Sequence, residues 1–203
     1  SGEQVAGYKA SVNSYRFWSP ARVVDDLTLL AERYGVRHVK FADELFVLNT
    51  RHVNAICDGI LERGLGLNIW AYARVDSVRD AMIDKLARAG VRWLAFGIEA
   101  GSGKVRADVD KDFDDEALYR VLEKVRAAGI HVIGNYIFAL PEDDHVSMQR
   151  TLDLALEVNS EFANFYCTMA YPGSSLYERA LAEHWALPES WSGYSQHSVD
   201  TLP

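Results

Sequence analysis

Cysteine is scarce in this 203-residue sequence, which contains only Cys57 and Cys167, far apart in the chain. Two thiols exclude a scaffold stapled by several disulfides, and they also exclude a self-contained metal cluster held by cysteine ligands alone. Few and widely separated cysteines are typical of proteins from a reducing compartment. We therefore expect a cytoplasmic protein.

The sequence also lacks an excess of positive charge and a long apolar run. Asp and Glu number 29 against 21 Lys and Arg, which gives a formal charge of -8. A broad nucleic-acid-binding surface is not expected, because phosphate binding requires clustered positive charge. No apolar run approaches the roughly 20 residues that span a bilayer, and the first residues show no signal-peptide pattern. We expect neither a nucleic-acid partner nor a membrane span.

What is present is the composition of an ordinary globular domain, with 49% hydrophobic and 25% charged residues. No linker, low-complexity tract or charge block divides the sequence. Residues 1–203 are therefore predicted to form a single domain. Residues 1–18 form its N-terminal segment, and residues 185–203 form a C-terminal tail in which no motif identifies a substrate.

Five short apolar runs predict β-strands, because they are rich in β-branched and aromatic residues. Stretches with helical spacing lie between them, and Ser19-Pro20 is a helix-start signal. This alternation predicts a parallel sheet with right-handed crossovers and with strands buried on both faces. The predicted strands are residues 36–41, 67–72, 91–96, 130–138 and 162–169.

The order of the elements limits the architecture. The series opens on a helix, whereas an α/β barrel normally opens on a strand, and an eight-stranded barrel needs about 250 residues. We therefore predict an α/β fold in the form of an open, partial barrel that lacks its first strand.

Each predicted strand ends in a polar group, and in parallel α/β folds such groups meet at one edge of the sheet. Adjacent carboxylates suit an ammonium group, an arginine suits a carboxylate, and a glutamate suits the hydroxyls of a ribose. Any one of these groups could instead neutralise a neighbour or cap the next helix. Together they favour one zwitterionic, ribose-bearing ligand. The groups are Asp43-Glu44, Arg74 with Asp76, Glu99, Asn135 and Tyr171-Pro172-Gly173-Ser174.

Other motifs favour structural roles. Residues 97–104 resemble a phosphate-binding loop, but the glycine spacing is one residue too long and Val105 replaces the metal-binding hydroxyl residue. The six histidines lack metal-ligand spacing. Cys57 lies on an apolar helical stripe, and Cys167 lies in a predicted strand without a catalytic signature. We expect both thiols to pack and expect no metal ligands among these residues.

The strand-end motifs, in their order, resemble the radical S-adenosylmethionine (radical SAM) superfamily, especially its cobalamin-associated branch. The resemblance implies a partial (β/α)6 TIM-like barrel with outer helices. It also implies S-adenosylmethionine as a cofactor, which the complete enzyme cleaves reductively to a 5′-deoxyadenosyl radical. The motifs run from about Asn13 to Tyr177 and comprise residues 15–20, 41–46, 73–76, 97–102, 135–142 and 171–174.

The resemblance also implies roles for individual residues. Asp43 and Glu44 match the acidic motif that binds the amino group of the cofactor, and Arg74 and Glu99 match positions used for its carboxylate and ribose. Asn135 and Ile137 lie on the strand beside ribose and adenine, and Tyr171, Pro172 and Gly173 match the turn below the adenine. Two positions depart from the family, because Asn135 and Ala139 stand where glycine is frequent.

The family also uses a Cys-x3-Cys-x2-Cys loop after the first strand to bind a [4Fe-4S] cluster, and this sequence contains neither the loop nor the strand. We therefore expect an inactive fragment whose parent carries both upstream of Ser1. Further upstream we expect a cobalamin-binding domain, as in a cobalamin-dependent methyltransferase. The sheet edge beside residues 36–41 is then expected to be open, covered by the N-terminal segment, or used for self-association.

Two alternatives remain open. A relative that has lost its cluster would serve as a binding or scaffold module. An ordinary α/β-barrel lyase or aldolase would need a lysine at a strand end, and only Lys40 lies near one.

Overall fold

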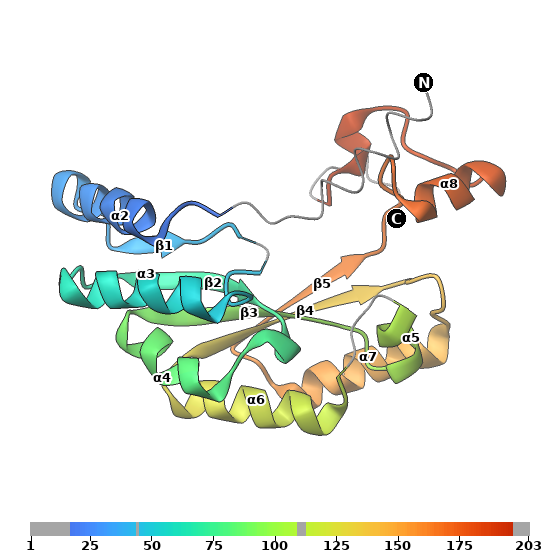
Figure 1. The fold of residues 1–203 in the computed structure, drawn as a ribbon. Coiled ribbons are helices and arrows are strands. Elements are labelled where there is room, and N and C mark those ends of the chain that lie inside the picture. Colours follow the sequence, from blue (N-terminus) through green and yellow to red (C-terminus); the bar gives the residue numbers. More distant parts are fainter. Residues whose placement is uncertain (1–16, 44, 109–112, 197–203) are drawn as a thin grey trace.

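Five parallel strands form one curled sheet in chain order, each pairing with the next along the sequence (Figure 1). The computed structural model describes residues 17–43, 45–108 and 113–196. The curled half-barrel confirms the predicted α/β partial barrel. The strands are β1 (His38–Lys40), β2 (Asn68–Ala73), β3 (Val91–Glu99), β4 (His131–Phe138) and β5 (Phe162–Cys167).

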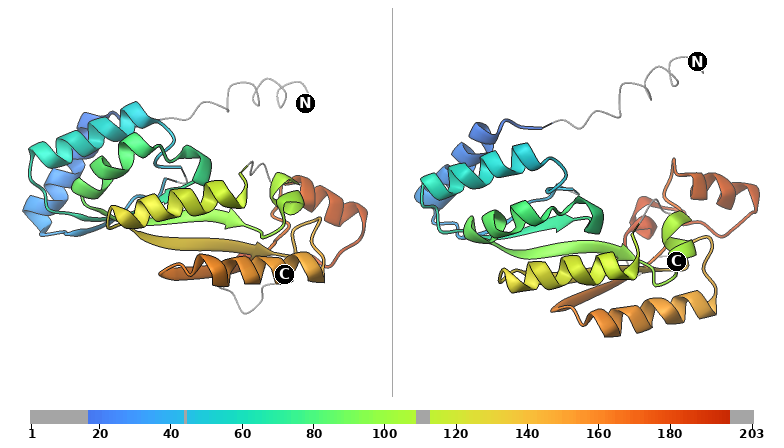
Figure 2. Two further views of the ribbon diagram at one scale, coloured as in Figure 1. Left: turned by 90° about the horizontal axis from the view of Figure 1, so that it is seen from below. Right: turned by 60° about the horizontal axis from the view of Figure 1, so that its bottom comes forward.

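The helices up to α7 (His145–Val158) lie against the convex face of the sheet (Figure 2). The Ser19 hydroxyl accepts a hydrogen bond from the Arg22 amide at the start of the first described helix, and Gly35, at φ 67°, ends it. These capping residues confirm the predicted helix start. The helices are α2 (Pro20–Tyr34), α3 (Thr50–Glu62), α4 (Asp80–Arg88), α5 (Gly103–Asp108), α6 (Asp115–Ala127), α7 (His145–Val158) and α8 (Ser175–Ala182), with short 3-10 helices η1 (Val75–Ser77) and η2 (Trp191–Tyr194).

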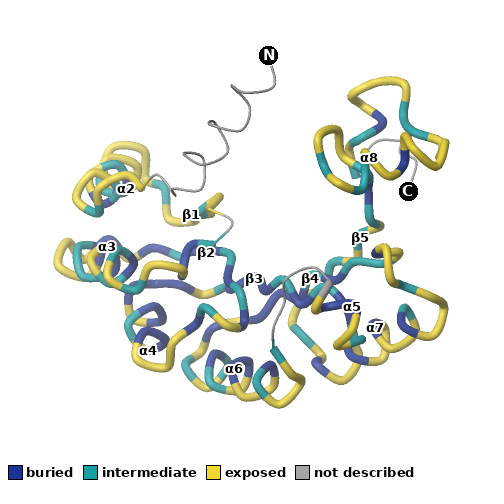
Figure 3. The backbone as a smooth tube through the Cα atoms, turned by 45° about the vertical axis from the view of Figure 1, so that its right-hand side comes forward, coloured by how far each residue is buried: buried dark blue, intermediate teal, exposed yellow. Residues whose placement is uncertain are grey.

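The hydrophobic core lies between the helices and the convex face. Leu94, Phe96 and Ile98 of β3 are fully buried beneath the helices, and so is Tyr136 of β4. In Figure 3 the central strands are accordingly coloured as buried over much of their length, and the outer surfaces of the helices as exposed. Side chains of β3 and β4 therefore form the centre of the hydrophobic core.

The concave face is less covered than the sequence predicted. Along β2 the residues alternate between buried and half-buried, and β1 and β5 contain no fully buried residue. The prediction of strands buried on both faces was wrong for these parts of the sheet. The reason is that the helices cover only the convex face, so alternate side chains of every strand point into an open lumen.

Both ends of the described chain differ from the central repeat. Strand β1 pairs only with β2, and within the residues that the structure describes its outer edge has no partner strand. After β5 the chain leaves the sheet, and α8 with η2 lies beyond it (Figure 1). Among the described helices, none is both long and apolar enough to cross a membrane.

Candidate functional site

A cavity of about 550 Å³ opens on the concave face at the carboxyl ends of the strands. Its floor on β3 consists of Ala95 and Gly97, which are small, whereas larger side chains flank them on the neighbouring strands. A volume of this size lies in the range of small-molecule sites. The predicted site residues that line the cavity are Arg74, Glu99, Asn135 and Ile137.

Arg74 follows β2 and is held by a neighbouring carboxylate. Its Nε and one terminal nitrogen donate to the two carboxylate oxygens of Asp76, at 2.9 Å and 2.7 Å. The Arg74 side chain is 27% exposed, so this fork-to-fork pair lies at the cavity wall rather than in open solvent. The pair matches the expected neutralising role and also fixes the guanidinium at the cavity.

Glu99 ends β3 in an unusual backbone conformation. Its φ is 67°, in the left-handed region, and the pairing of β3 with β4 shifts register between Gly97 and Glu99. A non-glycine residue in this region carries local strain of about 1 kcal/mol or more, and such strain is concentrated at functional sites. The bulge turns Glu99 into the wall of the cavity.

The loop after Glu99 is fastened to the helices behind it. The Gly101 amide donates to the hydroxyl of buried Thr151 in α7 at 2.9 Å. Arg106 of α5 is 3% exposed, donates to the Ala100 carbonyl at 3.3 Å and pairs with Asp115 at 2.6 Å. These contacts fix the loop that follows Glu99. No sequence pattern predicted that Arg106 is buried.

Asn135 and Ile137 reach the cavity from β4. The Asn135 amide nitrogen donates to the Phe96 carbonyl at 3.3 Å, and its amide oxygen accepts from Asn164 of β5 at 2.9 Å. The side chain thereby links three strands across the concave face. This network sets the orientation of the Asn135 side chain at the cavity.

The other predicted site residues do not line this cavity. Asp43 is exposed between the lining residues Ala42 and Leu45, and Glu44 lies outside the described residues. Tyr171, Pro172 and Gly173 lie beyond β5 in a turn whose last residue, Ser174, caps α8. Strand β5 ends at Cys167, before the predicted end at residue 169, so this turn departs from the sheet.

Two tyrosines that the sequence analysis did not select also line the cavity. Tyr72 of β2 and Tyr166 of β5 stand on the concave face, next to the positions of Arg74 and Asn164. The available signal was the alternation along each strand, because residues two apart share a face. Aromatic walls of this kind suit a flat ring system.

The glycine-rich motif after β3 makes contacts that hold neighbouring loops together. Gly101 binds Thr151, and Lys104 pairs with Glu142 at 2.8 Å. The hydrogen bond and the charge of Lys104 lower the pKa of the Glu142 carboxyl. The contacts fasten the loops after β3 and β4 to each other and to α7.

Ala139, which stands where the related family often has glycine, keeps a backbone suited to glycine. Its φ is 60°, directly after the end of β4. The left-handed turn is therefore retained, and the methyl group is accommodated at an exposed position.

The two cysteines differ in environment. Cys57 is buried in α3, as predicted, and burial raises the pKa of its thiol to about 11, with a smaller contribution from Asp58. Cys167 is exposed at the end of β5, so the prediction that it packs was wrong. The cause is that the described helices do not cover this edge strand.

The described residues do not fit an iron–sulfur cluster. They contain no group of three or more His, Cys, Asp or Glu side chains that could hold a metal ion. The whole sequence has two cysteines, and these lie in α3 and at the end of β5. This donor set is too small for a three-thiolate cluster site.

Curated relatives resemble the chain over most of its length. An uncharacterized methyltransferase of Pyrococcus horikoshii is 25% identical over 181 residues, which are 89% of this chain and 39% of the relative. An anaerobic magnesium-protoporphyrin IX monomethyl ester cyclase of Rubrivivax gelatinosus is 26% identical over 166 residues, 81% of this chain and 30% of the relative. The chain thus spans less than half the length of these relatives.

Solved structures share the fold. The radical S-adenosylmethionine methyltransferase TsrM of Kitasatospora setae, with cobalamin and a [4Fe-4S] cluster bound, superposes with a TM-score of 0.67 at 20% identity. The match covers 73% of this chain and 30% of TsrM. The cobalamin-dependent S-adenosylmethionine radical enzyme OxsB superposes with a TM-score of 0.62 at 20% identity, over 85% of this chain and 26% of OxsB.

A family model covers four of the five strands that line the cavity or lead to it. The model of the radical SAM superfamily matches residues 7–155, which include β1 to β4 and most of α7. Arg74, Glu99, Asn135 and Ile137 all lie inside this match. The match covers more than half of the sequence and agrees with the half-barrel fold. This chain therefore belongs to the radical SAM superfamily.

Proposed function

We propose that the cavity at the carboxyl ends of the strands binds S-adenosylmethionine, and that the chain is the cofactor-binding core of a radical SAM enzyme. The observation that carries the proposal is the convergence of Arg74, Glu99 and Asn135, from three consecutive strands, on one cavity of about 550 Å³. A cation, an anion and an amide at one small cavity suit a ligand that is both zwitterionic and rich in hydroxyl groups.

The methionine end of the ligand is assigned to the side of β1 and β2. Arg74, oriented by Asp76 at 2.7 Å, offers its guanidinium to the carboxylate of the ligand. Asp43, exposed next to the lining residue Ala42, offers a carboxylate to the amino group, and Glu44 is assigned the same role from its sequence position. Each charged group of the ligand would then face a protein side chain of the opposite charge.

The nucleoside end is assigned to β3 and β4. Glu99 accepts hydrogen bonds from the ribose hydroxyls, and Asn135 and Ile137 lie beside ribose and adenine. Gly97 and Ala95 leave room for the sugar to approach the sheet. Tyr171, Pro172 and Gly173, which lie outside the cavity, are assigned to the turn below the adenine only in the complete protein.

The cluster is assigned to residues outside this sequence. When bound, it would supply the electron that cleaves the carbon–sulfur bond of S-adenosylmethionine. We propose that the complete protein carries a further strand and a Cys-x3-Cys-x2-Cys loop before Ser1, and a cobalamin-binding domain before these. The 203-residue chain alone is then expected to bind the cofactor weakly and not to cleave it.

A second candidate function is a binding or scaffold module that works without a cluster. The presence of only two cysteines, one of them buried, favours it. The parent reading frame separates the two candidates. Three upstream cysteines with the family spacing support the enzyme, whereas a natural start near Ser1 supports the module.

The cofactor site can be tested on the chain itself by calorimetric titration with S-adenosylmethionine, adenosine and methionine. The cofactor is expected to bind with a Kd on the order of 0.1–1 mM. Glu99→Gln should weaken the binding of S-adenosylmethionine and adenosine about tenfold, because charge-assisted hydrogen bonds are lost. Arg74→Gln should weaken the binding of S-adenosylmethionine and methionine but not that of adenosine.

Glu116→Gln, which makes the same chemical change on the exposed face of α6, is the matched control and should leave all three affinities unchanged. Equal losses for adenosine and methionine in both cavity variants would point to misfolding rather than to a bipartite site. Undiminished binding in Glu99→Gln would contradict the assignment of this residue.

A further inference from the structure

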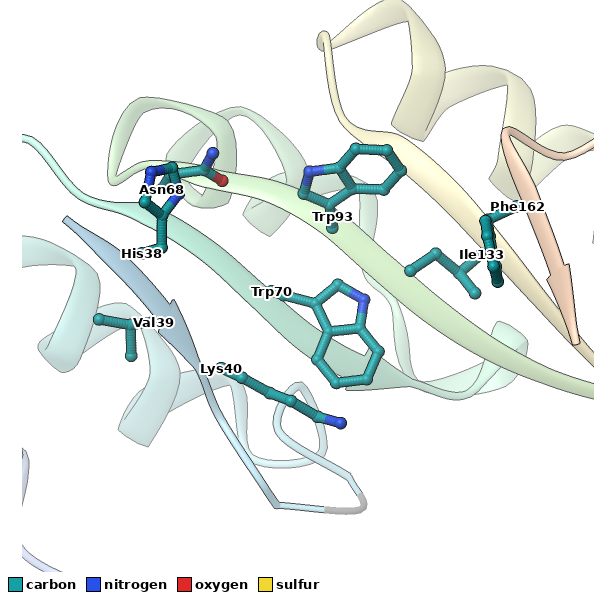
Figure 4. Close-up of a pocket in the computed structure, with 8 residues that line it drawn as sticks. All are labelled: His38, Val39, Lys40, Asn68, Trp70, Trp93, Ile133 and Phe162. Atoms are coloured by element: carbon teal, nitrogen blue, oxygen red, sulfur yellow. The ribbon is translucent and has the colours of Figure 1, made fainter. Parts of the chain in front are cut away.

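A second cavity, of about 590 Å³, lies at the amino-terminal end of the same concave face. Figure 4 shows the indoles of Trp70 and Trp93 on this face, with Ile133 and Phe162 on the strands beyond and Lys40 next to Trp70. The walls are mainly aromatic and aliphatic. The volume lies in the range of ligand sites.

The strand register explains how the aromatic walls form. Lys40 pairs with Trp70, Trp70 with Trp93, and Trp93 with His131 across four neighbouring strands. In a parallel sheet, paired residues point to the same face, so these side chains form one row across the lumen. Ile133 of β4 pairs with Phe162 of β5 in the strand register, so these two side chains also point to the same face.

The only full charge among the described lining residues is positive. The Lys40 ammonium lies 3.7 Å from the centre of the Trp70 ring and 5.2 Å from that of Tyr72. No acidic residue belongs to the described lining. Glu161, just before β5, is engaged by Arg126 at 3.4 Å and by the Val132 amide at 2.8 Å. The cavity therefore complements an anion rather than a cation.

One donor of the wall is also unsatisfied. The indole N–H of Trp70 is buried, and among the described residues it has no hydrogen-bond acceptor. A buried donor without an acceptor is unfavourable by about 1–3 kcal/mol.

This cavity is separate from the one at the carboxyl ends. The Trp70 and Tyr72 rings meet edge to face, with centroids 4.6 Å apart, and they line different cavities. The described linings of the two cavities share no residue. A ligand at the amino-terminal end would therefore leave the Glu99 site accessible.

We propose that the amino-terminal cavity is a binding site for an amphipathic organic anion, namely a flat aromatic carboxylate. The ring system lies against Trp70, Trp93 and Phe162, and the carboxylate lies at the Lys40 ammonium. Aromatic surfaces bind flat rings by stacking and by exclusion of water, and the lysine selects the sign of the charge. The proposal does not depend on the function of the carboxyl-end cavity.

The test compares three naphthalene probes that differ in charge: 2-naphthoate, neutral 2-naphthol and the cationic (2-naphthyl)methylammonium. Calorimetric titration of the full chain at pH 7 and low salt should show that 2-naphthoate binds about fivefold more tightly than 2-naphthol. The cation should bind most weakly. Lys40→Met should lower the affinity for 2-naphthoate to that of 2-naphthol and leave 2-naphthol unchanged.

Two further variants keep the result interpretable. Phe162→Ala removes an exposed ring from an edge strand. It should lower the affinity for each of the three probes about threefold. Lys124→Met is the matched control: Lys124 lies on α6 and pairs at the surface with Asp80 of α4, so its variant removes the same charge elsewhere and should bind the probes as wild type does. Lys40 is exposed, so unchanged circular dichroism of its variant is expected.

Equal binding of the three probes, or an equal loss in Lys40→Met and Lys124→Met, would overturn the proposal. Absence of binding by 2-naphthoate would overturn it as well. A chain that dimerises, and that binds the probe only when diluted to monomer, would assign the cavity to an interface between copies instead.

Discussion

The two ends of the concave face share the same strands but differ in chemistry. At the amino-terminal end, residues within the strands form a row of large aromatic side chains with one lysine. At the carboxyl end, β3 contributes the small residues Ala95 and Gly97 and, at its last position, Glu99, and the charged side chains stand where the strands run into loops. The difference shows that the alternation of side chains within strands determines the lining of the amino-terminal cavity. The ends of the strands and their loops determine the lining of the carboxyl-end cavity.

The ends also differ in the backbone that supports them. Glu99 and Ala139, at φ 67° and 60°, follow the carboxyl ends of β3 and β4. Before β3 and β4 the left-handed residues are glycines, Gly90 at φ 100° and Gly129 at φ 77°, and before β5 the left-handed residue is Asn159 at φ 43°. Among the described non-glycine residues with a left-handed backbone, Glu99 is the one that lines the proposed cofactor site.

The largest expected effect comes from glycines that other backbone segments approach closely. A Cβ at Gly101 would lie 2.3 Å from the Arg150 carbonyl oxygen, and one at Gly90 would lie 2.2 Å from that of Leu67. Each alanine variant should lose roughly 2–4 kcal/mol of unfolding free energy in urea titrations. The molecules that stay folded should bind adenosine more weakly in Gly101→Ala but not in Gly90→Ala, because Gly101 lies two residues after Glu99 whereas Gly90 lies at the other end of β3.

Gly103→Ala is the matched control, since its Cβ would have open space and its φ is not left-handed. It should be neutral or slightly stabilising at the start of α5. An equally large loss in this variant would mean that the loop does not tolerate substitution for reasons other than close approach.

The two cysteines allow a comparison between the covered core, which contains Cys57 of α3, and the uncovered edge strand β5, which ends at Cys167. The unfolded thiol of Cys57 ionises near pH 9, whereas burial keeps it protonated to about pH 11 in the folded chain. Above pH 9 the unfolded state has released a proton that the folded state retains, so stability should fall between pH 9 and 11, by roughly 2–3 kcal/mol. Urea titrations of wild type and Cys57→Val across this range measure the difference.

Cys167 supplies the internal comparison. In the native chain at pH 8, Ellman's reagent should modify this exposed thiol quickly and Cys57 only after unfolding. Fast modification of two thiols in the native chain would contradict the burial of Cys57.

A smaller effect is expected where α7 fastens the Glu99 loop. Thr151→Val keeps the shape of the side chain but leaves the Gly101 amide without its acceptor, and should lower the unfolding free energy by about 1–2 kcal/mol. Thr151→Ser keeps the hydroxyl and should lose less. A Val variant as stable as the Ser variant would show that this hydrogen bond does not hold the loop.

The smallest effect concerns the left-handed turn after β4. Ala139→Gly relieves the backbone at φ 60° and should raise the unfolding free energy by roughly 0.5–1 kcal/mol. Ala81→Gly, in the exposed first turn of α4, should instead lower it by about 1 kcal/mol. Thermal or urea unfolding of both variants checks the opposite signs.

The sequence predicted the strand order and most strand positions, because apolar runs between glycines and helical stripes are local signals. It also brought together Arg74, Glu99, Asn135 and Ile137, since residues at the ends of parallel strands meet at one edge. Tyr171 follows the last strand, as predicted, but it does not line the cavity, because β5 ends at Cys167 and the chain then turns into α8. How far β5 continues depends on packing that no local pattern encodes.

The aromatic cavity could not be predicted for a similar reason. Trp70 and Trp93 are neighbours only through a register shift between β2 and β3, which follows from tertiary pairing. The exposure of Cys167 likewise depends on the course of the chain after β5. Local patterns describe single strands, whereas register and helix coverage determine which side chains meet.

The most direct test of the account is where a nucleoside binds on the concave face. Titration of the ¹⁵N-labelled chain with adenosine, followed by two-dimensional NMR, reports both ends at once. We expect the largest shifts in the amides of residues 97–101 and 135–139, with the indole N–H signals of Trp70 and Trp93 unchanged. Shifts of those indole signals, with the amides of residues 97–101 unmoved, would contradict the assignment of Glu99 to ribose.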